Sequence, residues 1–424
     1  MPREYLPRTS DKMLELQLEA SGAVLVEGPK WCGKTTSCEQ FAKSALYLQD
    51  PSERSRNLQL AELAPQSLLN GEAPRLLDEW QDAPQLWDAV RYEVDRRGEP
   101  GQFLLTGSTV PPDRESTRHS GTGRIARMRM RTMSLWESGD SAGGVSLAGL
   151  FRGGPLPVSE CADGLEELAY LVCRGGWPSS LGLSRRAALQ QAFNYLDAIV
   201  EEDVSRVDGT RRDAHTARML LRSYSRMVSS QGSYASMRAD MASGGAPISE
   251  NTFYDYEGAL RKLFVVDDLP AWNPNLRSKT AIRTSPTRHL CDPSVAVAAL
   301  GAGPGEILND LNTLGLLFES MAVRDLRCYA SALDGEVLHY RDKSGLESDA
   351  VVRLRNGRYG LAEVKLGGES AIEDGAASLK ALANRIDAGA VGAPAFLLVI
   401  TGVGSMSYPR ADGVSVVPLR ALRP

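Results

Sequence analysis

The chain has 424 residues, enough for about three domains that each bury a core, so a small scaffold that depends on disulfides is excluded. Hydrophobic residues make up 42% and charged residues 24% of it, which excludes a disordered chain and is typical of an ordinary globular protein. The net charge of −5 excludes a polybasic protein but leaves room for a local basic region.

The first twelve residues carry five charged side chains and no apolar segment of the kind found in signal peptides. Because no stretch of about 18 uncharged apolar residues follows, we expect a cytoplasmic protein with no membrane partner. The six cysteines are scattered, without a Cys-x-x-Cys pair or a nearby pair of histidines. We therefore expect reduced core residues rather than disulfides or zinc ligands.

Residues 1–150 alternate short apolar runs with helical patterns. Strands are expected at 24–26, 75–78 and 102–106. A helix containing Phe41 and Ala42 should follow the first strand, and the spacing of Leu86, Val90 and Val94 predicts another. This alternation indicates an α/β domain with a parallel sheet covered on both faces.

The loop after the first strand has the pattern Gly-x-x-x-x-Gly-Lys-Thr. In this pattern the glycines let backbone N–H groups close around a phosphate, the lysine reaches the outer phosphates, and the threonine hydroxyl is a ligand for Mg²⁺. We predict a nucleotide-phosphate and Mg²⁺ site, with Lys34 also acting in catalysis and Thr35 on the metal, formed by Gly28, Pro29, Lys30, Trp31, Cys32, Gly33, Lys34, Thr35 and Thr36.

Two carboxylates close the next strand, in the sequence Leu76-Leu77-Asp78-Glu79. Asp78 is predicted to hold the Mg²⁺, and Glu79 to orient and deprotonate the attacking water. The following strand ends in Thr106 and Ser108, whose hydroxyls could sense the γ-phosphate. Ordinary turn chemistry explains these two residues as well.

Between residues 121 and 131, arginines alternate with apolar residues. One interpretation makes Arg124 or Arg127 an arginine finger that reaches the nucleotide of a neighbouring copy, which would require a homo-oligomer. The other interpretation makes them the polar side of an edge strand. The pattern favours neither.

Residues 151–282 are predicted to be mainly helical, over 165–206 with an interruption at Arg174-Gly-Gly-Trp-Pro178, and over 217–228. After a Gly/Ser-rich break, Ser249 is expected to cap a further helix, and residues 265–269 to form a strand. Three helices and a strand outline a winged helix-turn-helix. The predicted buried face of the third helix consists of Phe253, Tyr256, Leu260, Leu263 and Phe264.

A basic excess favours DNA as a partner of this middle region. Residues 211–290 contain 12 Lys or Arg residues and 7 Asp or Glu residues, although the whole chain is acidic. Asp255 and Glu257, on or near the presumed reading helix, suit a protein-docking module instead. DNA and a protein partner both stay open.

Residues 283–424 form a second α/β pattern. Asp292, before Pro293, is expected to cap a helix. A long helix over 311–329 and a second over 372–386 are expected. The predicted strands cover 337–340, 349–354, 359–365, 396–401 and 414–417.

In this order, the motifs resemble prokaryotic AAA-type ATPases of the archaeal-type branch, fused to a C-terminal domain of formerly unknown function related to PD-(D/E)xK nucleases. The resemblance implies ATP binding, ATP hydrolysis and a winged-helix segment between two α/β domains, and it supplies no substrate. It covers almost the whole chain and rests on residues 28–35, 76–79, 104–108, 123–126, 133–135, 174–178, 292, 347–349 and 363–365.

Nuclease chemistry of this type needs an Asp near the end of one strand, an acidic residue on the paired strand to share a divalent metal, and a Lys two residues later to orient water. Asp349, Glu363 and Lys365 fit these catalytic roles, with both carboxylates as metal ligands, and Glu319 could complete the metal site. Ser348 stands where the nuclease motif has proline. An inactive copy of the fold that only binds a partner therefore stays open.

Two functions follow. The first is a protein whose ATP state controls a winged-helix and nuclease-like module acting on DNA. The alternative is an ATP-switched regulatory or scaffold protein whose nuclease-like domain has lost catalysis.

Overall fold

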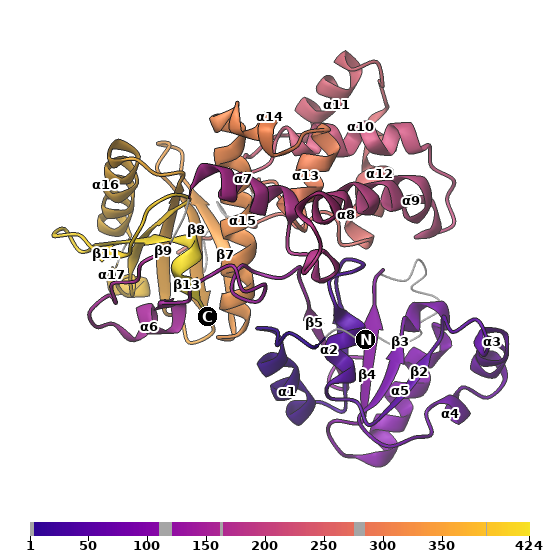
Figure 1. The fold of residues 1–424 in the computed structure, drawn as a ribbon. Coiled ribbons are helices and arrows are strands. Elements are labelled where there is room, and N and C mark those ends of the chain that lie inside the picture. Colours follow the sequence, from indigo (N-terminus) through magenta and orange to yellow (C-terminus); the bar gives the residue numbers. More distant parts are fainter. Residues whose placement is uncertain (1–3, 110–120, 162–163, 275–284, 387) are drawn as a thin grey trace. The chain divides into compact units, whose positions relative to one another are not determined.

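The computed structural model describes residues 4–109, 121–161, 164–274, 285–386 and 388–424. Its contacts divide the chain into two compact units (Figure 1). Unit 1 comprises residues 1–132, 201–212 and 256–265, and unit 2 comprises residues 133–200, 213–255 and 266–424. The division into three domains, at 150/151 and 282/283, stays a prediction, and its second boundary falls outside the described residues.

Unit 1 is built on a five-stranded parallel sheet with the strand order β2-β3-β4-β1-β5. Its helices cover both faces, α1 and α2 on one and α3, α4 and α5 on the other, which confirms the predicted architecture. The strands are β1 (Ala23–Glu27), β2 (Ser44–Tyr47), β3 (Arg75–Asp78), β4 (Phe103–Gly107) and β5 (Ile125–Arg129). The helices are α1 (Asp11–Ala20), α2 (Lys34–Glu39), α3 (Arg54–Leu63), α4 (Pro65–Leu68) and α5 (Gln85–Arg97).

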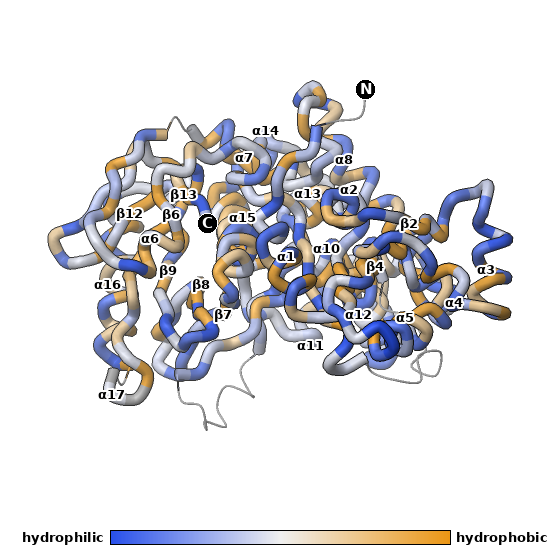
Figure 2. The backbone as a smooth tube through the Cα atoms, turned by 90° about the horizontal axis from the view of Figure 1, so that it is seen from below, coloured by the Kyte–Doolittle hydropathy of each residue, from blue (hydrophilic) through white to orange (hydrophobic). Residues whose placement is uncertain are grey.

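Alternate residues of β1, β3 and β4 enter different cores. Leu77 belongs to the core on the α5 side, whereas its neighbour Leu76 belongs to the core on the α1 side. Along the covering helices, hydrophilic and hydrophobic residues alternate (Figure 2). The helix predicted to contain Phe41 and Ala42 was placed too long, because α2 ends at Glu39 and the chain turns to enter β2.

The helices of the middle region are α6 (Leu147–Arg152), α7 (Leu165–Arg174), α8 (Arg185–Ala198), α9 (Val204–Arg206), α10 (Ala214–Ser225), α11 (Tyr234–Ser243) and α12 (Glu250–Lys262). Ser249 caps α12 as predicted, accepting the N–H of Thr252 at 3.1 Å. No pattern in the sequence indicated α11. The strand predicted over 265–269 is wrong, because this segment makes only single bridges, from Val266 to Leu290 and from Leu269 to Thr287.

Unit 2 contains a six-stranded mixed sheet in the order β11-β12-β10-β9-β8-β7. Strands β7, β8 and β9 are antiparallel neighbours, and β10 runs parallel to β9 and β12. The strands are β7 (Gly335–Arg341), β8 (Glu347–Leu354), β9 (Tyr359–Lys365), β10 (Leu397–Thr401), β11 (Tyr408–Pro409) and β12 (Val414–Pro418), with a separate pair of β6 (Val145–Ser146) and β13 (Leu422–Arg423). The helices are α13 (Pro293–Leu300), α14 (Pro304–Leu308), α15 (Leu311–Ser331), α16 (Glu369–Arg385) and α17 (Ala388–Val391), so the long helices and strands predicted here are confirmed.

The Arg-Gly-Gly-Trp-Pro motif at 174–178 has a structural role in unit 2. A Cβ on Gly176 would lie 2.0 Å from the carbonyl oxygen of Met133, so the close approach of the two backbones requires glycine here. The N–H of Gly176 donates to buried Asp292 at 2.9 Å, and Trp177 Nε1 donates to Ser294 Oγ at 2.9 Å. The motif therefore fixes the turn after α7 against the start of α13.

Two further expectations concern the whole chain. All six cysteines lie in described segments as thiols rather than disulfides, and five of them are buried. In the part of the chain that the structure describes, no helix combines the length and apolar character needed to cross a membrane.

Candidate nucleotide site and C-terminal carboxylate cluster

The phosphate loop, residues 28–36, runs from the end of β1 into the first turn of α2. Gly28 has a φ of 157°, and a Cβ there would lie 2.1 Å from the carbonyl oxygen of Met130. Lys34 is buried, and its Nζ donates to the carbonyl oxygens of Gly28 at 3.0 Å and Pro29 at 2.9 Å. The loop thus folds around its lysine at the start of a helix, the arrangement that binds an anion.

The carboxyl ends of β3 and β4 meet the first turn of α2. Thr35 Oγ1 and Thr106 Oγ1 each donate to Asp78 Oδ1 at 2.7 Å. Burial raises the pKa of Asp78, while these two hydroxyl hydrogen bonds act in the opposite direction. Hydroxyl and carboxylate oxygens are the donors that Mg²⁺ prefers, so Thr35 and Asp78 fit a magnesium site.

Glu79 is held beside this pair by residues of β4 and of the following turn. Ser108 Oγ donates to Glu79 Oε2 at 2.8 Å, and Gln81 Nε2 donates to the same oxygen. The N–H of Glu79 donates to Thr106 Oγ1 at 3.0 Å. The structure therefore brings Glu79, Thr106 and Ser108 together and adds Gln81, which sequence reasoning missed although it lies two residues from Glu79.

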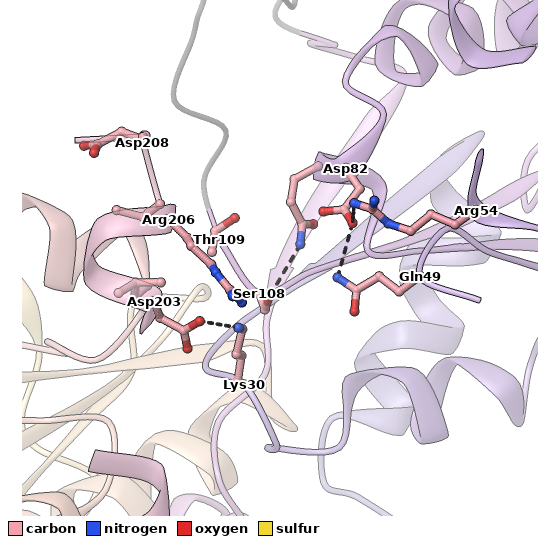
Figure 3. Close-up of a pocket in the computed structure, with 13 residues that line it drawn as sticks. Lys30, Gln49, Arg54, Asp82, Ser108, Thr109, Asp203, Arg206 and Asp208 are labelled. Atoms are coloured by element: carbon pink, nitrogen blue, oxygen red, sulfur yellow. Dashed lines mark hydrogen bonds and ion pairs between the residues drawn. The ribbon is translucent and has the colours of Figure 1, made fainter. Parts of the chain in front are cut away.

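A cavity of about 780 Å³ opens beside the phosphate loop within unit 1 (Figure 3). Lys30 and Ser108 line it together with Asp203 and Arg206, which come from the segment 201–212. Lys30 Nζ lies 2.5 Å from Asp203 Oδ1. Nothing in the sequence pattern marked Asp203 or Arg206, because more than 160 residues separate them from the loop.

Two predicted loop residues contribute differently from the others. Trp31 is exposed at the tip of the loop. The side chain of Cys32 is buried in the core on the α1 side.

Arg124 does not reach the phosphate loop of its own chain. It precedes β5, where Ile125 lies opposite Ala23 at the start of β1, whereas the loop follows the other end of β1. Its Nε pairs with Asp95 Oδ1 at 2.8 Å, and Arg127 pairs with Glu27 at 3.5 Å. A role for either arginine in a neighbouring copy stays a prediction.

The C-terminal candidate residues gather at neighbouring ends of β8 and β9. The register places Ala350 opposite Ala362, so Asp349 and Glu363 are the next pair along. Lys365 Nζ lies 2.6 Å from Glu363 Oε2 and 3.7 Å from Asp349 Oδ2. Asp349 Oδ2 also accepts the N–H of Val364 at 2.7 Å.

The electrostatics of this cluster show several carboxylates crowded together. Burial, and next the charge of Asp349, raise the pKa of Glu363 to about 8. The same two causes raise the pKa of Glu319 well above its usual range, which places Glu319 within electrostatic reach of the pair. The carboxylates in turn raise the pKa of Lys365, against the effect of its own burial.

The cluster fits a divalent cation only in part. Glu363 Oε1 is buried and has no hydrogen-bond partner among the described residues, as a metal ligand lacking its ion would. However, no group of three or more His, Cys, Asp or Glu side chains is arranged to hold a metal in the described part of the chain. The Lys365 ammonium here neutralises the carboxylates that a cation would share.

The basic region predicted over 211–290 is largely neutralised. Most of its described cations form ion pairs with nearby carboxylates: Arg212, Arg218, Arg226, Arg238, Arg261, Lys262 and Arg288. Such pairs reduce the positive potential that a phosphate backbone would meet.

Comparison with known proteins agrees with the phosphate-loop geometry. Residues 20–138 match a family model described as an AAA domain. The N-terminal part of the chain is P-loop ATPase-like. Two further models, each described as a domain of unknown function, match residues 165–306 (DUF8612) and 314–422 (DUF4143).

Relatives over the whole chain are distant. An uncharacterized protein of Mycobacterium tuberculosis and one of Mycobacterium bovis are each 26% identical over 418 residues, covering 97% of this chain and 83% of their own. A solved Walker-type ATPase of Pyrococcus abyssi is 15% identical with a TM-score of 0.43, covering 70% of this chain and 96% of its own.

Proposed function

We propose that the protein binds and hydrolyses ATP at the phosphate loop, and that its nucleotide state controls a winged-helix and nuclease-like module acting on DNA. The observation that supports the ATPase part of the proposal is a shared acceptor: Asp78 Oδ1 accepts hydrogen bonds from the hydroxyls of both Thr35 and Thr106. Beside it, Ser108 holds the Glu79 carboxylate. One set of contacts thereby joins the phosphate loop, the metal ligands and the candidate base.

Each group has a distinct role in this reaction. Lys34 and the loop N–H groups bind the outer phosphates, and Thr35 and Asp78 would hold Mg²⁺, which would neutralise charge on the phosphate oxygens. Ser108 and Gln81 orient the Glu79 carboxylate, and Glu79 positions the attacking water and accepts its proton.

Substitution at these positions tests the ATPase half. We expect Lys34→Ala to abolish ATP binding, and Glu79→Gln to keep binding but lower turnover by at least about 100-fold, since the amide cannot accept the proton. Calorimetry measures binding and phosphate release measures turnover. Glu72→Gln, at an exposed position, is the matched control and should behave as wild type. Normal turnover in either active-site variant would contradict the assignment.

The nuclease half rests on topology and on the paired strand ends. Helix α15 is followed by the three antiparallel strands β7 to β9, and this helix–strand–strand–strand order supports the nuclease part of the proposal. Asp349, Glu363 and Lys365 lie together at one end of these strands. In this proposal α10, α11 and α12 form the winged helix that grips the DNA.

Two observations favour the alternative of an inactive, partner-binding module. The Lys365 ammonium is bound by the carboxylates themselves, and no three-residue metal group occurs among the described residues. The paired cations of residues 211–290 weaken the case for DNA in particular. The alternative therefore keeps the ATP switch and removes the cleavage.

Nicking of supercoiled DNA in the presence of Mg²⁺ separates the two. If the nuclease half holds, wild type nicks, ATP changes the rate, and Asp349→Ala and Lys365→Ala each abolish nicking because they remove metal binding and water orientation. Asp374→Ala, at an exposed position on α16, should nick normally. No nicking by any form would support the alternative, and nicking untouched by both site variants would remove the nuclease assignment.

A further inference from the structure

The phosphate loop carries a second lysine whose partner lies far away in the sequence. Lys30 stands between Gly28 and Gly33, and its side chain is 36% exposed. Its partner Asp203 is only 5% exposed, and the two are 2.5 Å apart (Figure 3). Asp203 Oδ2 is buried and has no hydrogen-bond partner among the described residues. Lys30 is therefore the main compensation for this buried carboxylate.

Asp203 belongs to an irregular and well-anchored segment. It ends a π-helical turn, Ile199–Asp203, between α8 and α9, and π-helical turns are frequent at functional sites. A few residues further on, Asp208 pairs with Arg212 at 2.7 Å and with Lys262, the last residue of α12, at 3.0 Å. A displacement of Asp203 would therefore change the positions of residues 199–212 and of the end of α12.

Lys30 lies on the side of the loop where the terminal phosphate would react. It lines the same cavity as Ser108 and Gln81, which hold the candidate base Glu79. A lysine ammonium is a flexible point charge that can turn from one anion to another. The Asp203 carboxylate and a terminal phosphate bound near Lys30 would repel each other, because both are negatively charged and the site is partly buried.

We propose that Asp203 competes with the terminal phosphate of ATP for Lys30. The proposal rests on the ATP site proposed above. Without a terminal phosphate, Lys30 stays on Asp203. With ATP, the phosphate draws Lys30 away, the buried carboxylate loses its compensation, and the turn at 199–203 must shift to give it a new partner or water. ADP leaves the ion pair in place, so residues 199–212 distinguish ATP from ADP.

The test compares the binding of a non-hydrolysable ATP analogue, AMP-PNP, with that of ADP. Asp203→Asn keeps the side-chain size and removes the competing charge, so we expect AMP-PNP to bind about fivefold more tightly while ADP affinity stays the same. In a Lys30→Met background the Asp203→Asn gain should vanish, because the contested ammonium is absent. Asp82→Asn is the matched control, since Asp82 lines the same cavity but pairs with Arg54 rather than with the loop.

The outcomes distinguish failure of the proposed role of Asp203 from failure of the proposed ATP site. Weaker AMP-PNP binding by Asp203→Asn, an equal gain from Asp82→Asn, or a gain that persists without Lys30 would overturn the role of Asp203. If wild type binds neither nucleotide, or if Lys34→Ala binds both normally, the ATP site itself is wrong. Hydrogen exchange gives a second measurement: wild-type residues 199–212 should change protection with AMP-PNP and not with ADP, and identical exchange in both would contradict the proposal.

Discussion

His289 is a buried histidine of unit 2, with its Nδ1 3.1 Å from the hydroxyl oxygen of Ser320. Burial, assisted by the charge of Arg327, lowers the pKa of His289 to about 3. In the unfolded chain a histidine titrates near pH 6.5. Between these two values the unfolded chain binds a proton that the folded protein does not, so the free energy of unfolding falls as the pH falls below about 6.5.

We predict that replacing this histidine removes part of the acid sensitivity. From pH 7 to pH 5, His289 contributes a loss of about 2 kcal/mol, which His289→Asn should abolish because asparagine does not titrate. Urea unfolding at both pH values measures the difference. His339, whose pKa burial lowers to about 4, retains its own contribution of the same sign. An unchanged profile in His289→Asn would contradict the assignment.

Helix α13 begins at a cap that also joins distant segments. Buried Asp292 accepts the N–H of Ser294 at 3.0 Å, as the sequence predicts for a cap. It also accepts the N–H of Gly176 at 2.9 Å and pairs with Arg324 at 3.0 Å, and neither contact could be inferred from the sequence. Arg324 in turn pairs with Asp325 at 2.7 Å. One carboxylate therefore connects α7, α13 and α15.

We expect Asp292→Ala to lower the free energy of unfolding by about 3 to 5 kcal/mol, because it leaves a buried guanidinium and a buried N–H group without this acceptor. Chemical denaturation followed by circular dichroism measures the loss. Asp310→Ala is the control, since Asp310 caps α15 through Thr313 on the exposed surface. It should cost much less, and equal losses in the two variants would show that Asp292 acts only as a cap.

Elements were predictable wherever their pattern was local. The strand over 359–365 and the cap of α12 at Ser249 are confirmed, since apolar runs and capping residues act over a few positions. The prediction of a strand over 265–269 is wrong, because this segment makes only single bridges to Leu290 and Thr287. A β-prone run becomes a strand only when a neighbour supplies the ladder of hydrogen bonds.

At the scale of the whole molecule, the charge counted along the sequence differs from the charge left unpaired in the folded protein. The basic excess over 211–290 is real in the sequence, but its residues are shared between the two units, and most described cations there are paired with carboxylates. Order along the chain does not define unit 1 either, because residues 201–212 and 256–265 belong to unit 1 although they follow segments of unit 2. A count along the sequence therefore does not give the potential of a surface.

The sequence by itself determined the phosphate loop, the carboxylates that end β3, the parallel sheet of unit 1 and the order of elements in the last third. These follow from short-range rules, since glycine, capping residues and apolar periodicity act within one turn or one strand. Only the tertiary structure decided that Asp203 pairs with Lys30 and that Asp292 joins three helices. The same holds for the ion pair of Lys365 with the Glu363 carboxylate. Those contacts depend on how separate segments pack, because burial and the loss of water select partners that no local pattern encodes.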